Sequence, residues 1–511
     1  MIIFRSTSLI CYLLMFVFLI FMFNKVSADQ SLPDESLNPS KILKIILERN
    51  FDIKISNYTT KEKDGDLKKS YSEFDTNLRY NYVLDKNNVP SSSSLDGAGN
   101  TSSVITENST HTLRVTKTLE NGIKVDVPYT YKSVYSNSTY RTIQTSYEPS
   151  LGVVLTLPVI KYFNFDYASR NIKNKELELA VALKKHSEKI IDIFSSTMDL
   201  YYDYLESRKG LEIAKITLEN SKENYLFAVE KSKVGRISRI DLLDAESAYK
   251  SSEDALIKKE NELINKEQKL SLNIYGDIVK INLNVDQNNN INVDNNKILS
   301  PLPNEVETIE SALKSRIEII RSNESRNQAQ IKYDFSRVDL YPTLDLQPEI
   351  TLRGMNSSGG EANKDIKDRK YTSWKVGLTA ERKWNQYAAI GANNMDKLKL
   401  EQEIIKEDQV KKDIILEVKQ SLRDLASLEK RISSLKLSAS AQEGKYAALN
   451  AKFKLGVVTM FDLNEAYKQK VQSSLDLLKA QIEYKKNLIS YFKATGKLMD
   501  ELLDKKDSIL N

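Results

Sequence analysis

The sequence has few residues that interrupt regular secondary structure. Glycine occurs 16 times and proline 10 times in 511 residues, together about 5% of the chain against roughly 12% in an average protein. Long uninterrupted elements are therefore expected. Charged residues make up 28% and hydrophobic residues 41%, which excludes both a polytopic helical membrane protein and a disordered chain dominated by charge.

The chain also lacks a set of thiols and a clear excess of one charge. Its single cysteine, Cys11, lies in an apolar segment near the N-terminus, so a disulfide framework and a cysteine-based metal site are excluded. The 75 basic and 70 acidic residues give a net charge of +5, too balanced to indicate nucleic-acid binding. No phosphate loop, HExxH or dinucleotide motif is present, and neither histidine has a candidate catalytic or metal partner near it. We expect no enzyme activity, cofactor or metal.

The N-terminal segment predicts export. Arg5 precedes an apolar run from Leu9 to Phe23, and Val26-Ser27-Ala28 forms a small-x-small site typical of signal peptidase cleavage. We expect residues 1–28 to be a signal peptide. An uncleaved anchor is the alternative, because the apolar run is nearly as long as a short transmembrane span.

A long internal repeat follows. Lys233–Ala245 resembles Lys454–Ala466 at an offset of 221, whereas Leu47–Ile53 resembles Leu313–Ile319 at an offset of 266. The first copy therefore carries an insertion of 45 residues. Self-similarity of this kind predicts two structural units of the same design. The expected divisions are a first repeat at 29–284, an Asn-rich linker at 285–303, a second repeat at 304–497 and a C-terminal tail at 498–511.

Each repeat is expected to contain a pair of amphipathic strands. Apolar and polar residues alternate over 74–84 and 344–353, and returning strands are expected at 147–157 and 374–380. The edge of a soluble sandwich has the same alternation. An apolar face of Tyr, Trp and Leu in an exported chain favours a lipid-facing sheet.

The insertion lies between the strands of the first pair. A loop rich in Ser, Asn and Gly at 90–110 precedes two further strands, 113–119 and 123–131. The Asn121-Gly122 dipeptide between them is a strong hairpin signal. Pro128 indicates an edge position for the second strand. We interpret this hairpin as an addition above the membrane, which leaves four strands per chain for the membrane sheet.

Long helices follow each strand pair. Residues 167–233 and 392–455 contain no proline and one glycine each, enough for about 100 Å of helix at ~1.5 Å per residue. Apolar residues recur with a period of 3.5, which makes helices wind around each other as a coiled coil. The residues in this pattern are Leu242, Tyr249, Leu256, Leu263 and Leu270 in the first copy, and Ile414, Val418, Ser421, Leu425, Leu428, Ile432, Leu435 and Ala439 in the second.

These lengths predict a shared tube. Four strands cannot close a barrel, which needs about eight, and open strand edges are unfavourable in lipid. Several chains must then contribute to one barrel. Charged helices of about 100 Å are too long for a membrane core of about 30 Å, so they must project into water.

In the order and duplication of these parts, the chain resembles the TolC family of outer membrane efflux proteins over nearly all of the mature sequence. The resemblance also rests on Tyr341-Pro342 at the start of a strand, on Leu155–Pro158 at the end of another, and on two tip turns, Val234-Gly235-Arg236 and Leu455-Gly456-Val457. Two positions depart from the pattern, because Tyr71-Ser72 and Ala380-Glu381 lack the proline that the other repeat has.

The resemblance implies a homotrimer in the outer membrane. Four strands per chain would form a twelve-stranded transmembrane β-barrel, continued by a periplasmic α-helical barrel of coiled-coil helices. The implied function is a passive exit duct for a tripartite efflux pump or a type I secretion system. Such a duct docks on a periplasmic adaptor protein and, through it, on an inner membrane transporter. An exported coiled-coil structural or surface protein is the alternative, and the adaptor itself is disfavoured by the two hairpins.

The two tip turns are the candidate functional sites. By resemblance, the residues that dock on the adaptor are Val234, Gly235, Arg236, Leu455, Gly456 and Val457. Two carboxylate pairs follow the turns, Asp241 with Asp244 and Asp462 with Glu465, each pair on one helix face. Acidic residues in a first helical turn also favour the helix dipole without any further role. The resemblance implies that these carboxylates ring the periplasmic mouth, with Arg236 and Arg239 as cations that link neighbouring hairpins and keep the gate closed.

Overall fold

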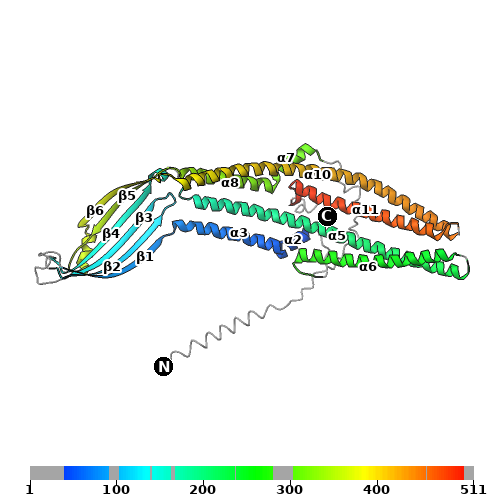
Figure 1. Ribbon diagram of the computed structural model, residues 1–511, viewed down its shortest axis with the longest axis horizontal. Coiled ribbons are helices and arrows are strands. Elements are labelled where there is room, and N and C mark those ends of the chain that lie inside the picture. Colours follow the sequence, from blue (N-terminus) through cyan, green and yellow to red (C-terminus); the bar gives the residue numbers. More distant parts are fainter. Residues whose placement is uncertain are drawn as a thin grey trace, which may run out of the picture.

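The molecule is long and narrow, with a sheet at one end and helices that run from it to the other end (Figure 1). The computed structural model describes residues 39–90, 103–138, 141–162, 167–235, 237–279, 303–455 and 457–499. The expected signal peptide lies outside these residues, as do almost all of the expected linker and most of the expected tail.

One antiparallel sheet of six strands contains both strand pairs and the inserted hairpin. Its neighbours follow chain order from β1 to β6. The strands are β1 (Asn77–Pro90), β2 (Ser103–Thr118), β3 (Lys124–Ser136), β4 (Thr145–Pro158), β5 (Thr343–Arg353) and β6 (Tyr371–Glu381). The prediction of four strands per chain is therefore wrong, and the twelve-strand count that depended on it loses its basis. The four expected strands and the hairpin strands are present, although β1 begins only after a 3-10 turn, η1 (Tyr71–Phe74).

The inserted hairpin lies in line with the other strands, not above them. β2 pairs with β1 along its length, and β3 pairs with both β2 and β4. Its turn lies at the helix end of the sheet, because a Cβ added at Gly122 would be 3.2 Å from the Cβ of Ala168 and 3.5 Å from Pro158. Gly122 has a φ of +84°, the left-handed conformation that its turn requires. The polar first half of β2 weakens the alternation that would have marked it as a membrane strand.

Pro128 lies in an interior strand, contrary to the edge position expected from its sequence. It is paired with Arg114 of β2, while the ladder between β3 and β4 is interrupted there. A Cβ at Gly152 would come within 3.3 Å of the Pro128 ring. A residue without a side chain on β4 thus leaves room for a ring that cannot donate to the ladder.

The register gives the sheet one apolar and one polar face. Residues that face one side in a row across five strands are Tyr80, Leu113, Tyr129, Leu151 and Leu352. The next row, on the opposite face, is Asn81, Thr112, Thr130, Ser150 and Arg353. Because side chains alternate along a strand, the same division holds over the helix-proximal part of the sheet and includes the inserted hairpin. Toward the helix-distal end of β1 and β2, the apolar face becomes polar, since Lys86 and Glu107 lie on it and pair at 2.6 Å.

A short helix covers part of the apolar face. α9 (Gly359–Lys367) lies between β5 and β6, where only a connecting segment was expected. The Tyr129 hydroxyl on the apolar face donates to Asn363 Oδ1 of α9 at 2.9 Å. Ala362 of α9 is fully buried, so α9 packs on the sheet, at the end of the sheet that is far from the long helices.

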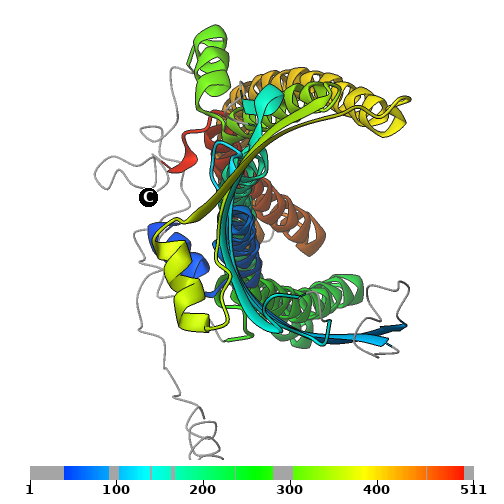
Figure 2. The same cartoon turned by 90° about the vertical axis from the view of Figure 1, so that its left-hand side faces the viewer.

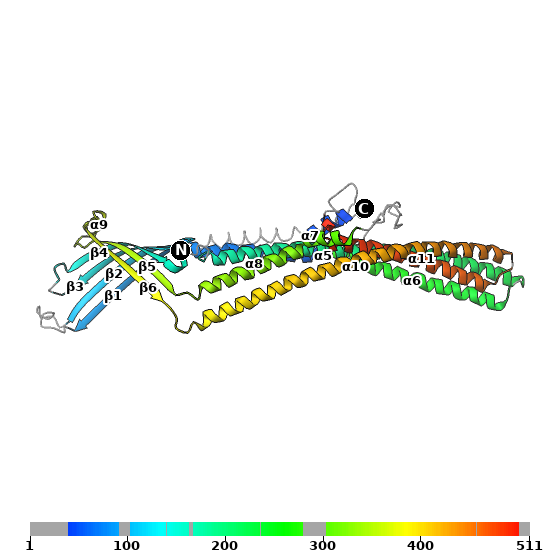
Figure 3. The same ribbon diagram turned by 90° about the horizontal axis from the view of Figure 1, so that it is seen from above.

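The helices form four strips that continue the sheet. At the sheet end these are α3 (Phe51–Ser70), α5 (Arg170–Lys233), α8 (Ile317–Val338) and α10 (Tyr387–Lys454) (Figure 1). At the far end, α6 (Arg239–Tyr275) and α11 (Met460–Ala494) replace α3 and α8 (Figure 3). The short helices are α2 (Pro39–Arg49), α4 (Val159–Tyr162) and α7 (Glu305–Ser315). With 64 and 68 residues, α5 and α10 are each about 100 Å long at ~1.5 Å per residue, as predicted.

Seen along its length, the molecule is an open curved wall (Figure 2). Its helices pack through the predicted coiled-coil seams, since Val418, Leu425 and Ile432 are at most 5% exposed. The main core lies where α5, α6, α10 and α11 meet the short helices and includes Phe194, Leu270 and Tyr484. None of the helices in the described ranges is both long and apolar enough to cross a membrane.

Candidate functional site

The first tip is the turn between α5 and α6. Gly235 has a φ of +66°, and a Cβ added there would meet no atom within 4 Å. The glycine is therefore needed for backbone conformation rather than for space. Val234 beside it is 65% exposed. Arg236 lies outside the described residues.

The second tip joins α10 to α11 in the same way. Leu455 and Val457 are 81% and 72% exposed, and the Val457 amide donates to the Lys452 carbonyl at 3.1 Å. Gly456 lies outside the described residues. The exposed residues at both tips are available to a partner, as expected for docking candidates.

The first carboxylate of each pair lies in the first turn of its helix and bonds to the residue that caps that helix. Ser238 Oγ accepts from the Asp241 amide at 3.1 Å and donates to the Asp241 carboxylate at 2.7 Å. Thr459 and Asp462 form a reciprocal capping box, in which Thr459 Oγ1 donates to Asp462 Oδ2 at 2.6 Å. A structural role in the first turn is thus established for both aspartates.

The second carboxylate of each pair lies one turn further along. Glu465 is exposed and accepts from Gln469 at 3.1 Å, and Asp244 is half-buried. No ion pair joins Arg239 to a carboxylate within the part of the chain that the structure describes.

Two exposed apolar residues at the tips were not among the docking candidates predicted from the sequence. Ile240 and Phe461 are 72% and 61% exposed in the first turns of α6 and α11. They are separated by the repeat offset of 221, so the repeat itself carried a signal for them. Together with Val234, Leu455 and Val457, they form an exposed apolar rim on the two hairpins.

A small apolar cluster joins the two hairpins just behind this rim. Its buried members are Ala228, Ala245, Met460 and Leu463. The rings of Phe227 and Phe453 lie 5.7 Å apart across α5 and α10. The tips of one chain are thus held together as a unit.

Between the tips and the sheet, an acidic residue on α5 links three helices. Asp203 on α5 pairs with Lys266 on α6 at 2.6 Å and also with Lys486 on α11. Burial alone would raise the pKa of Asp203, but hydrogen bonds from the two lysines outweigh it and lower this pKa below its usual value. The ionised carboxylate therefore connects the two hairpins.

Near the middle of the molecule, two interruptions between helices support the C-terminal ends of α6 and α11. One is Asn50, between α2 and α3, and the other is Arg316, between α7 and α8. Asn50 Nδ2 donates to the Asn273 carbonyl at 2.9 Å, and Arg316 Nη1 donates to the Lys493 and Ala494 carbonyls at 3.3 and 3.2 Å. Both break residues have the same extended backbone and are 266 residues apart. The carbonyls that end a helix are satisfied in both halves.

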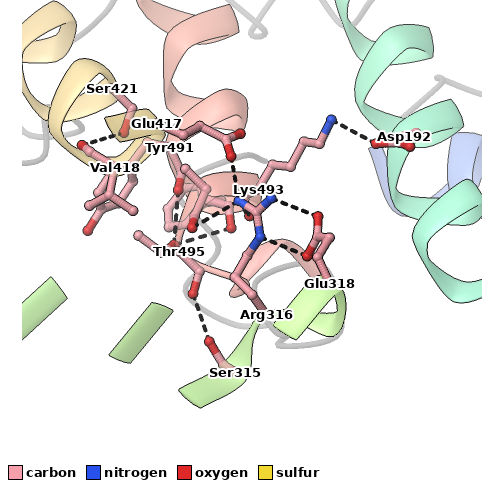
Figure 4. Close-up of polar contacts among 12 residues, drawn as sticks. Asp192, Ser315, Arg316, Glu318, Glu417, Val418, Ser421, Tyr491, Lys493 and Thr495 are labelled. Atoms are coloured by element: carbon pink, nitrogen blue, oxygen red, sulfur yellow. Dashed lines mark hydrogen bonds and ion pairs between the residues drawn. The ribbon is translucent and has the colours of Figure 1, made fainter. Parts of the chain in front are cut away.

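Arg316 does this as a buried charge (Figure 4). It is 6% exposed, binds Glu318 through two nitrogens at 2.7 and 2.9 Å, and binds Glu417 at 2.8 Å. Burial opposes its charge, but the two carboxylates outweigh this and raise the pKa of Arg316. Burial would likewise raise the pKa of Glu318, which the Arg316 hydrogen bonds instead lower. The site is a structural junction, and no group of three or more potential metal ligands occurs among the described residues.

Comparison with known proteins agrees with this geometry. Residues 308–497 match the family described as outer membrane efflux protein. No curated protein sequence matches the chain.

Solved structures match over most of the chain. The Neisseria gonorrhoeae MtrE outer membrane channel is 14% identical with a TM-score of 0.63, covering 93% of this chain and 94% of that one. The Campylobacter jejuni CmeC outer membrane channel is 12% identical with a TM-score of 0.61, over 93% and 88%. The Vibrio cholerae outer membrane protein VceC is 10% identical with a TM-score of 0.61, over 90% and 96%. At these identities the structures show a common fold.

The matched family is described by efflux, a transport activity, and the description includes no enzyme activity. The predicted localisation in the outer membrane, with the helices in the periplasm, agrees with the family match. The resemblance to the TolC family of outer membrane efflux proteins is thus confirmed, through the match of residues 308–497 and a fold shared over 93% of the chain.

Proposed function

We propose that the chain is the outer membrane exit duct of a tripartite efflux pump or a type I secretion system, and that it acts as a homotrimer. The observation that carries this proposal is the sheet with an apolar face across all six strands at its helix end, which leads directly into helices about 100 Å long. An apolar outer face suits lipid and a polar inner face suits an aqueous lumen. The alternative, a coiled-coil rod, does not account for a sheet of this kind.

The two tips dock on a periplasmic adaptor, which connects the duct to an inner membrane transporter. The exposed apolar rim supports this, because exposed side chains of this size on a helical hairpin suit packing against another helical hairpin. The docking residues are Val234, Gly235, Arg236, Leu455, Gly456 and Val457, to which Ile240 and Phe461 are added.

Cysteine crosslinking tests the docking. Cys11, the only cysteine, lies in the expected signal peptide, so Val234→Cys and Leu455→Cys would each place a single thiol on a tip of the mature protein. We expect crosslinking in cells to capture an adaptor at both positions. Leu437→Cys on α10, 73% exposed but away from the tips, is the matched control. Equal capture at all three positions would refute docking through the tips.

The carboxylates at the tips form the periplasmic gate. In a trimer, each acidic position occurs three times around the mouth, which attracts cations and resists closure unless the charges are paired. Arg236 and Arg239 are the proposed partners. This part of the proposal depends on Asp241, Asp244, Asp462 and Glu465 facing the mouth.

Charge removal without loss of shape separates gating from capping. Asp462→Asn with Glu465→Gln keeps a side chain that accepts from Thr459 but removes both charges. We expect a reduced cation preference of the pore in planar bilayers, and the same direction for Asp241→Asn with Asp244→Asn. If ion selectivity and conductance stay at wild-type values, the carboxylates serve only as helix caps.

A further inference from the structure

The two edge strands of the sheet, β1 and β6, each pair with one neighbour, and the outer edge of each has no strand partner within the described chain. Backbone groups left unpaired in lipid are strongly unfavourable, so a membrane sheet must close on itself. Six strands are too few, because the smallest closed membrane barrels have about eight. The edges therefore need strands from other chains.

Both edge strands have the features of interior membrane strands. On β1, Leu78, Tyr80 and Leu84 are exposed on the apolar face, and on β6 Trp374, Val376 and Leu378 are exposed on the same face. Polar residues such as Arg79 and Lys375 alternate with them on the opposite face. Trp374 is 77% exposed, and a large apolar side chain exposed beside other apolar residues is unfavourable on a strand edge in water.

The directions of the two strands also fit each other. β1 runs away from the helices and β6 runs back toward them, so β6 of one copy and β1 of the next are antiparallel. Asn77 begins β1 just after η1, and Glu381 ends β6 just before α10, which places both ends at the base of the sheet. Aligning these ends pairs Leu378 with Tyr80 and joins the apolar faces without a break.

We propose that three copies close an eighteen-stranded barrel, six strands from each, in which β6 of each copy pairs with β1 of the next. The number of copies rests on the trimer of the proposed function, while the strands per copy come from the sheet itself. The count exceeds the twelve strands that the family resemblance implies, because β2 and β3 belong to the membrane sheet.

The width of the helical layer supports six strands per copy. Strands ~4.8 Å apart and tilted by about 40° take up roughly 38 Å of circumference for six and roughly 25 Å for four. Four helices side by side, with ~9–10 Å between axes, take up roughly 36–40 Å. At this tilt, six strands thus take up about the same arc as the four helices α3, α5, α8 and α10.

The consequence is a wide aqueous pore at membrane level. Barrels of about 16–18 strands leave a water-filled channel. The polar face that would line it carries both signs of charge, including the Arg114–Asp126 pair at 3.0 Å and the Arg141–Glu148 pair at 2.7 Å. The outer membrane segment would then exclude little by size, and the periplasmic mouth would decide which solutes pass.

Paired cysteines test the edge contact. Tyr80→Cys with Leu378→Cys on one chain cannot form a disulfide within it, because four strands separate the positions. Oxidation of purified full-length protein should give covalent dimers and trimers on denaturing gels, and reduction should remove them. Moving the first thiol to Leu84→Cys, about 13 Å along the strand, is the matched control. Scanning the partner thiol over 376, 378 and 380 covers a shift of the register, and no crosslink at any of the three would overturn the proposal.

Strand counting provides a second measurement that needs no variant. An electron cryomicroscopy map of the full-length protein should show eighteen strands in one closed ring. A trimer with twelve barrel strands, and with β2 and β3 outside the ring, would overturn this inference but leave the proposed duct intact. A protein that forms no trimer would contradict the proposed function as well.

Discussion

The two halves of the molecule contain equivalent positions at which the same structural problem has different solutions. At the helix breaks, Asn50 uses a neutral amide, whereas Arg316 uses a buried cation held by two carboxylates. On the long helices, Asp203 binds two lysines, while Asp424, 221 residues later, is exposed. The two repeats thus share the same backbone at equivalent positions, whereas the side chains at these positions differ in charge and in partners.

The largest expected effect follows loss of the buried cation. Arg316→Ala leaves Glu318, Glu417 and two helix-end carbonyls without their partner, which should destabilise the fold by about 3 kcal/mol, as removal of one member of a buried ion pair does. Asn50→Ala loses neutral hydrogen bonds and should cost about 1 kcal/mol. Thermal unfolding in detergent, followed by circular dichroism, measures both.

A surface pair is the control for this comparison. Arg431 and Glu483 are about half exposed and 3.1 Å apart, so Arg431→Ala should cost at most about 0.5 kcal/mol. If Arg316→Ala unfolds at the same temperature as Asn50→Ala, the charge adds nothing to the junction beyond a cap.

An intermediate effect, dependent on pH, is expected at Asp203. Its lowered pKa means that the carboxylate stabilises the fold above its unfolded pKa of about 3.9, and that this contribution is lost as the pH falls through the folded value. Asp203→Asn should therefore destabilise the protein by about 2 kcal/mol at pH 7. The difference from wild type should shrink below about pH 4.

Asp424→Asn is the matched substitution in the other half. Because Asp424 is exposed, its replacement should change the unfolding temperature little at any pH. A pH-independent difference between Asp203→Asn and wild type would mean that the lysines do not depend on the ionised carboxylate.

The smallest effects are expected at the helix caps of the two tips. Thr459→Ala removes a reciprocal capping box, and Ser238→Ala removes a cap that accepts from one backbone amide. Each should loosen its first turn by about 1 kcal/mol, or roughly fivefold faster amide exchange, with the larger value for Thr459. Hydrogen exchange measured on peptides from the two tips distinguishes them. Equal protection in both variants and wild type would mean that docking or packing, not capping, orders the tips.

Much of the architecture could be read from local patterns. Scarce glycine and proline predicted the long helices, the 3.5-residue period predicted their seams, and Asn121-Gly122 predicted the hairpin turn. The offset of 266 between Leu47–Ile53 and Leu313–Ile319 identified the two segments as equivalent, although nothing in the sequence indicated that each contains a helix break or that the breaks support the ends of α6 and α11.

The failures occurred where a side chain's role depends on what lies beside it. Pro128 predicted an edge, but Gly152 on the next strand made an interior position possible. The polar first half of β2 concealed a strand that pairs with β1 along its whole length.

Amino-acid order alone was sufficient for the long helices, their lengths, the presence of the strands and the duplication, because helix and strand periodicities depend on residues a few positions apart. Tertiary structure alone decided that six strands form one sheet, that Asp203 joins three helices, and that Arg316 is buried. These outcomes depend on contacts between residues tens to hundreds of positions apart, and such contacts leave no periodic trace in a single sequence.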